Sequence, residues 1–166
     1  DSGMDTAVVP FCAIEQHGHH LPVGTDWLIA EAGARALGER LGAFVLPAVP
    51  FGCSREHMAF PGTVSLRPST LAALLEDIVE SLRRHGFRNI VVLSTHGGNW
   101  ILKPTLRELN FRYPELSLVW ATGPVPEKGE SVPEDIHAGQ GETSRIMHLR
   151  PDLVKDEFAE GDSPGT

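Results

Sequence analysis

The sequence has few of the features that mark a secreted or membrane protein. It contains two cysteines, Cys12 and Cys53, both in apolar surroundings. Two cysteines make no disulfide framework, and buried reduced thiols suit the cytosol. No charged-then-apolar leader opens the chain, and no apolar run reaches the roughly eighteen residues that a membrane span needs. We therefore expect a soluble, cytoplasmic protein.

Basic residues are also scarce. The chain has 14 Lys and Arg against 22 Asp and Glu, for a net charge of −8. This balance argues against nucleic-acid and anionic-membrane partners, because phosphates favour basic surfaces. It does not exclude a small substrate, which responds to the local field of its pocket. A nucleotide-binding domain is a weaker alternative, since no Gly-Lys-Ser/Thr follows the Gly-Gly turn after His96.

The composition is that of a globular protein. Of the 166 residues, 41% are apolar and 22% are charged, which allows one domain with a real core. We expect a single domain over residues 1–155. The acidic, Gly- and Pro-containing tail over 156–166 is expected to be frayed.

Apolar runs alternate with amphipathic segments along the chain. Strands are predicted over 7–14, 43–49, 89–95 and 116–121. Helices are predicted over 26–41 and 69–85, after His96 toward Tyr113, and near Glu142; a loop is predicted over 123–135. This order predicts a three-layer α/β/α fold with a mostly parallel sheet. Pro10 suggests that the first strand is irregular or lies at an edge.

Titratable side chains are concentrated directly after the first apolar run. Glu15, His17, His19, His20 and Asp26 lie within twelve residues, among glycines and a proline. Two carboxylates about 4 Å apart repel by roughly 4 kcal/mol at an effective dielectric near 20, unless a cation lies between them. Imidazole and carboxylate together are the usual ligands of Zn, Mn or Fe. The stretch therefore predicts a metal site.

Two further polar clusters follow later in the chain. His96 comes directly after the third predicted strand, and His137 and Glu142 precede the last predicted helix. Ligands of parallel α/β sheets gather outside the carboxyl ends of the strands. We therefore expect these clusters to meet the Glu15 cluster at one rim of the sheet.

The polar clusters belong to four motifs. They are Glu15-Gln-His17-Gly-x-His20-Leu-Pro-x-x-Thr-Asp26, Glu56-His57-x-x-Phe60-Pro-Gly-Thr63, His96-Gly-Gly-Asn99 and His137-Ala-Gly-x-x-Glu142-Thr-Ser. Together, and in this order, they resemble the creatininase family of metal-dependent amidohydrolases. The resemblance runs from about Val8 to Val154.

The resemblance implies a site for two divalent ions, Zn, Mn or Fe. Its ligands would be Glu15 and His96 for one ion, His17 and Glu142 for the other, and Asp26 between both. Three carboxylates, two divalent ions and a bridging hydroxide sum to zero charge. A neutral centre of this kind can be buried without a large uncompensated charge.

The implied chemistry is hydrolysis of a carbon–nitrogen bond in an amide, cyclic amide or formamide, with a metal-bridging hydroxide as nucleophile. Bound metal lowers the pKa of water from 15.7 to about 7. His137 would be the catalytic histidine, protonating the nitrogen leaving group. Candidate substrate contacts are His20, His57, Gly98 and Asn99. The substrate would be a small amide or a short peptide.

Three departures from the family pattern affect what is expected of this chain. His19 stands where the pattern usually has Pro, and Gly97 and Gly98 stand where the creatinine-cleaving branch has Tyr and Glu. Creatinine is therefore disfavoured as the substrate. The chain is also short for the family, so a non-catalytic metal- or ligand-binding member is the alternative. The resemblance further implies a ring-like homo-oligomer, commonly a hexamer.

Overall fold

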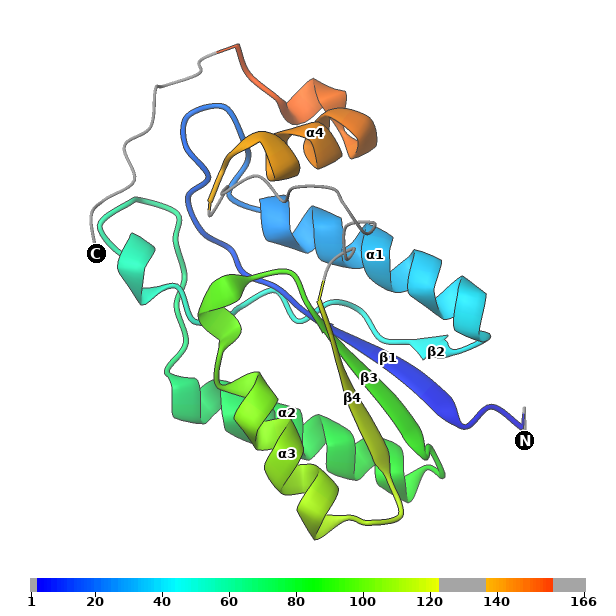
Figure 1. The fold of residues 1–166 in the computed structure, drawn as a ribbon. Helices are drawn as coiled ribbons and strands as arrows, with labels where there is room; N and C mark the ends of the chain where they lie inside the picture. Colours follow the sequence, from blue (N-terminus) through cyan, green and yellow to red (C-terminus); the bar gives the residue numbers. More distant parts are fainter. Residues whose placement is uncertain (1–2, 123–136, 157–166) are drawn as a thin grey trace, which may run out of the picture.

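The computed structural model describes residues 3–122 and 137–156 and contains a four-stranded parallel sheet (Figure 1). The strands are β1 (Thr6–Phe11), β2 (Phe44–Val45), β3 (Asn89–Ser94) and β4 (Ser117–Thr122), in the order β2-β1-β3-β4. All three strand pairs are parallel, and Ala7 pairs with Phe44 on one side and Ile90 on the other. The four carboxyl ends therefore point toward the same rim.

Helices cover both faces of this sheet (Figure 1). They are α1 (Thr25–Leu41), α2 (Pro68–Arg84), α3 (Leu102–Arg112) and α4 (Gln140–Leu149), with short 3-10 turns η1 (Arg55–His57), η2 (Gly97–Asn99) and η3 (Pro151–Leu153). Helix α1 lies on one face, α2 and α3 lie on the other, and α4 packs against α1. The predicted three-layer α/β/α fold is confirmed.

The side chains of β1 alternate between two cores. Val9 and Phe11 pack with leucines of α2 and α3, whereas Val8 packs with Ala34 of α1. This alternation follows from the period of two in a strand. It explains why the run is continuously apolar, since both of its faces are buried.

The prediction that Pro10 marks an edge strand or an irregular one is wrong. β1 lies between β2 and β3, and Pro10 pairs with Leu93 in register. The carbonyl of Pro10 accepts a hydrogen bond from Val49 N–H at 2.9 Å. Its nitrogen faces the same side, where β2 has already ended at Val45. The missing N–H therefore removes no ladder bond, and β2 is much shorter than the predicted strand over 43–49.

The helix boundaries agree with the sequence signals. Helix α1 ends at Gly42, which adopts the left-handed conformation with φ 60° and closes the helix with an N–H bond to the Gly38 carbonyl. Pro104 lies in the first turn of α3, where a backbone N–H would have no partner within the helix. The predicted loop over 123–135 and most of the predicted frayed tail, 157–166, lie outside the described residues.

None of the described helices combines the length and apolarity that crossing a lipid bilayer requires.

Candidate metal centre

The predicted ligands come together at the carboxyl rim of the sheet. Glu15 and His17 lie in the loop after β1, and Asp26 lies in the first turn of α1. His96 follows β3, and Glu142 lies in the first turn of α4. Three groups of three potential ligands have atoms within 4.8 Å of one another: Glu15, Asp26 and His96; His17, His137 and Glu142; and Glu15, His57 and His137. The expectation that the three clusters meet is confirmed.

The first group, which we call the sheet half, consists of Glu15, Asp26 and His96, and all three are buried. His96 Nδ1 lies 3.1 Å from Glu15 Oε1 and 3.4 Å from Asp26 Oδ2. Burial lowers the pKa of His96, but the two carboxylates outweigh it and raise the pKa to about 9. Burial raises the pKa of Glu15, and contact with His96 outweighs this so that the pKa falls below its usual value.

The second group, which we call the α4 half, consists of His17, His137 and Glu142. His17 Nε2 lies 3.6 Å from Glu142 Oε2 and 3.9 Å from Asp26 Oδ1. The two oxygens of Asp26 therefore face different imidazoles, one in each half. Burial raises the pKa of Asp26 to about 7, against the opposing charges of His17 and His96.

Backbone carbonyls orient the imidazoles of two candidate ligands, His96 and His17. His96 donates its Nε2–H to the Cys53 carbonyl at 2.8 Å, and His17 donates its Nδ1–H to the Glu15 carbonyl at 3.1 Å. In a neutral imidazole the other nitrogen then carries the lone pair. Those nitrogens, Nδ1 of His96 and Nε2 of His17, are the ones that face the carboxylates. Metal-binding histidines in proteins are held in this way.

Four buried atoms at this site have no hydrogen-bond partner among the described residues. They are both carboxylate oxygens of Glu15, Nε2 of His17 and Oδ2 of Asp26. A buried polar atom without a partner costs about 1–3 kcal/mol, and more when it is charged. Three carboxylate oxygens and one imidazole nitrogen are all electron-pair donors, so divalent cations would satisfy them. The residues present fit a metal site.

His137 lies at the mouth of the α4 half. Its Nε2 is 2.6 Å from the Gln16 carbonyl oxygen, and its ring stacks on His57 with centroids 4.2 Å apart. Its Nδ1 points toward Glu15 Oε1 at 3.6 Å. Burial lowers the pKa of His137, and the charges of His17 and His57 lower it further.

The residue after His137 is strained. Ala138 has φ 53°, and it is the one non-glycine with positive φ in the described ranges. Such a conformation costs about 1–3 kcal/mol and persists where surrounding contacts hold it. Here the Ala138 N–H donates to Glu142 Oε2 at 2.7 Å, which fixes that carboxylate toward His17.

The residues predicted to contact substrate have varied surroundings. His20 is buried, and its Nε2 lies 3.0 Å from Thr143 Oγ1 of α4. Asn99 is buried and bonds the backbone of both Cys12 and Cys53. The Nε2 atom of His57 lies 4.0 Å from Glu15 Oε1. His19 is exposed and belongs to none of the ligand groups.

The two glycines after His96 differ in the space around them. A Cβ on Gly98 would overlap the Cys53 carbonyl oxygen and His96 Nε2, whereas a Cβ on Gly97 would meet nothing within 4 Å. Gly98 therefore allows the close approach that orients His96. Any side chain at position 98 would meet the same overlap on this backbone.

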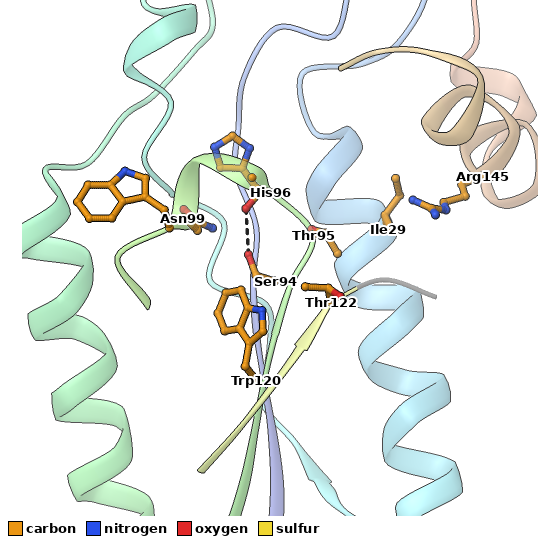
Figure 2. A pocket seen from close by; sticks show the side chains of 10 residues that line it. Ile29, Ser94, Thr95, His96, Asn99, Trp120, Thr122 and Arg145 are labelled. Carbon is orange, nitrogen blue, oxygen red and sulfur yellow. Dashed lines mark hydrogen bonds between the residues drawn. The ribbon is translucent and has the colours of Figure 1, made fainter. Parts of the chain in front are cut away.

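A cavity of about 390 Å³ opens beside His96 (Figure 2). Ser94 and Thr95 line it at the end of β3, and Trp120 lines it from β4. Figure 2 shows Arg145 reaching from α4 toward Ile29 on α1. The cavity thus combines aromatic, hydroxyl and cationic groups next to a candidate ligand.

Several contributors to the site were missed by sequence reasoning. Cys53 acts through its carbonyl, which any residue could supply, so the sequence carries no signal for it. Gln16 contacts two histidines from within the first motif, and its place between Glu15 and His17 is the one available signal. Arg145 and Trp120 carry chemistry suited to a pocket but lie in no motif.

Comparison with known proteins points to one family. The family profile described as creatinine amidohydrolase matches residues 1–166. A mycofactocin precursor peptide peptidase from Mycolicibacterium smegmatis is 37% identical over 98% of this chain and 65% of its own length. A creatinine amidohydrolase from Pseudomonas putida is 34% identical over 92% of this chain and 67% of its own length.

Solved structures agree. A Bacteroides fragilis protein assigned as a creatinine amidohydrolase matches with a TM-score of 0.82 and 39% identity over 98% of this chain and 68% of that one. Creatininases in a Zn-Zn form and a Mn form match with TM-scores of 0.76 and 0.78 at 29% and 31% identity, over 93% of this chain and 68% of each of theirs. This chain spans about two thirds of the length of the curated relatives above, 65% and 67%.

Proposed function

The chain belongs to the creatininase family, and from this premise we propose that it hydrolyses a carbon–nitrogen bond with the help of two divalent metal ions. Glu15 and His96 would hold one ion, and His17 and Glu142 the other. The observation that carries the proposal is the placement of Asp26 between the halves, with Oδ2 3.4 Å from His96 Nδ1 and Oδ1 3.9 Å from His17 Nε2.

When bound, the ions would polarise the substrate carbonyl and supply hydroxide near neutral pH as the nucleophile. The three carboxylates would offset most of the positive charge, so that the centre could stay buried. The carbonyls of Cys53 and Glu15 would hold the two ligand imidazoles with their lone pairs turned inward.

His137 would move the proton that the leaving nitrogen needs. Its Nε2 is engaged by the Gln16 carbonyl at 2.6 Å, so the proton would be taken up and delivered at Nδ1. The lowered pKa keeps the ring neutral at rest, which suits a group that first accepts a proton and then donates it.

The remainder of the substrate would enter the cavity beside His96. Its volume of about 390 Å³ suits a small amide, a formamide or the end of a short peptide. Relatives of this chain include both a peptidase and a creatinine amidohydrolase. Creatinine itself is disfavoured, because Gly97 and Gly98 replace the Tyr and Glu of the creatinine-cleaving branch.

The test combines metal analysis with turnover. The purified protein should contain about two ions per chain, lose hydrolysis of an amide, formamide and peptide panel on chelation, and regain it with Zn or Mn. Activity untouched by exhaustive chelation would contradict the proposal.

His137→Ala separates an enzyme from a metal-binding protein without turnover. The variant should keep most of its metal and lose about 10²–10⁴-fold in kcat, the usual contribution of a general acid–base. Unchanged kcat would remove His137 from the mechanism. Full metal occupancy with no turnover of any substrate in the wild type would favour the non-catalytic alternative.

A further inference from the structure

The side-chain amide of Gln16 lies beside the stacked rings of His57 and His137 and contacts one nitrogen of each. We infer that Gln16 is a positioning residue that fixes the hydrogens on both imidazoles. His57 then presents an N–H, and His137 a bare nitrogen, to the same carboxylate of Glu15. The consequence for turnover rests on the proposed function, whereas the hydrogen positions do not.

The orientation of the Gln16 amide follows from a backbone contact. The Gly18 N–H donates to Gln16 Oε1 at 2.8 Å, so the oxygen faces the loop. The amide nitrogen must therefore face the two histidines. It lies 3.0 Å from His57 Nδ1 and 3.1 Å from His137 Nε2.

Only one of these two contacts is a hydrogen bond. His137 Nε2 also lies 2.6 Å from the Gln16 carbonyl oxygen, which can only accept, so this nitrogen carries a hydrogen. It cannot then accept from the Gln16 amide. The amide hydrogen goes to His57 Nδ1, which must be bare.

This assignment also fixes whether the other nitrogen of each ring carries a hydrogen. His57 carries its hydrogen on Nε2, which faces Glu15 Oε1 at 4.0 Å. His137 in its neutral form has a lone pair on Nδ1, which faces the same oxygen at 3.6 Å. The two stacked rings, with centroids 4.2 Å apart, thus turn an N–H and a lone pair toward the same carboxylate oxygen, at distances longer than a hydrogen bond.

These hydrogen positions decide which of the candidate histidines can bind a metal ion. Glu15, His57 and His137 form a third group with ligand atoms within 4.8 Å. A protonated nitrogen cannot bind a metal, so Gln16 keeps His57 out of the ligand set. His57 instead turns its Nε2–H toward Glu15 Oε1 at 4.0 Å, which is beyond hydrogen-bond distance, so it acts on this candidate ligand as a neighbouring dipole. Changes to groups that support metal ligands typically alter metal affinity or activity about 10–100-fold, and we expect an effect of this size here.

Imidazole nitrogen NMR of the zinc-loaded protein tests the assignment. In the wild type, His57 Nδ1 should have the chemical shift of an unprotonated nitrogen and Nε2 that of a protonated one. In Gln16→Glu the new carboxylate can only accept, so the hydrogen should move to His57 Nδ1. Gln140→Glu, which adds the same charge at the exposed start of α4, should leave the His57 spectrum as in the wild type.

The kinetic expectation is a fall in kcat of about 10–100-fold in Gln16→Glu with KM little changed. A protonated Nδ1 on His57 in the wild type would overturn the inference, even if Gln16→Glu failed to fold. An identical His57 spectrum in wild type and Gln16→Glu would also overturn it. Absence of any turnover in the wild type would contradict the proposed function but leave the NMR result decisive for Gln16.

Discussion

The two halves of the candidate metal centre are built in different ways. In the sheet half, Glu15, Asp26 and His96 are all buried and come from the ends of β1 and β3 and the start of α1. In the α4 half, His17 is buried, but His137 and Glu142 are partly exposed. Helix α4 has its main contacts with α1 and η3, and none of comparable extent with the sheet, among the described elements.

Because of this difference, the two halves need not bind metal with equal affinity. The sheet half is held by strands and by the packed core, so its ligands are already in position. The α4 half depends on how α4 docks against α1. We expect tighter binding of the first ion in the sheet half and weaker binding of the second in the α4 half.

The largest effect is expected at Asp26, whose two carboxylate oxygens face one imidazole in each half. Asp26→Asn keeps the size of the side chain and removes its charge. Replacing a residue that hydrogen-bonds to a metal ligand lowers metal affinity about 10–100-fold. Loss of a ligand shared by both ions should lower the affinity for each ion by more than this. Elemental analysis should show less than one ion per chain. Retention of two ions would refute the shared role of Asp26.

Gly98 should matter far more than Gly97. Gly98→Ala would place a Cβ against the Cys53 carbonyl and His96, and overpacking of this kind costs about 1–3 kcal/mol. Gly97→Ala meets open space and should stay within about 0.5 kcal/mol of the wild type. Urea unfolding of the metal-free variants measures both. Equal free energies of unfolding for the two variants would show that a Cβ at position 98 fits without overlap.

Zinc binding to the sheet half should depend on pH. In the metal-free protein the pKa of His96 is raised to about 9, so a proton competes with zinc below that pH. Affinity should rise about tenfold per pH unit from 7 to 9 and level off above 9. Below pH 7 the slope should steepen, because Asp26, with a pKa of about 7, also holds a proton.

Competition with a chelator of known affinity measures this profile. An affinity that does not change between pH 7 and 9 would mean that His96 binds no proton there, and the close contact with Glu15 would need another explanation.

The smallest effect is expected where α4 docks. Thr143 Oγ1 lies 3.0 Å from His20 Nε2 and joins α4 to the loop that carries His17. Thr143→Val removes a hydrogen bond worth about 0.5–1.5 kcal/mol. The affinity for the second ion should therefore fall roughly 2- to 10-fold. The first ion should be unaffected.

Ser144→Ala is the matched control, because the Ser144 hydroxyl bonds only the Gly141 carbonyl of its own helix among the described partners. Zinc titration of both variants resolves the two steps. If Thr143→Val lowered the affinity for both ions equally, the two halves would not be held in place by separate parts of the fold.

The meeting of the polar clusters at one rim could be predicted from the sequence, because each cluster lies at a point that the fold brings there. Their assignment as metal ligands came from the resemblance to the creatininase family. Glu15 and His96 follow continuous apolar runs, and Asp26 and Glu142 begin helices. Parallel strands then place these points together. The roles of these residues as ligands, and of His137 in catalysis, remain predictions.

Other features depend on contacts between distant segments and left no local pattern. The carbonyl of Cys53 orients His96, and the Pro10 nitrogen faces the gap left where β2 ends. The short length of β2 and the orientation of the Gln16 amide likewise became visible only in three dimensions. Sequence periodicity describes one segment at a time, so it could not reveal them.

The most direct test of the central claim is an anomalous difference map from crystals of the zinc-saturated protein. We predict two peaks roughly 3.5–4 Å apart, one on either side of the Asp26 carboxylate. One would contact Glu15 and His96, and the other His17 and Glu142. A single peak, or peaks away from Asp26, in zinc-saturated crystals would contradict the account.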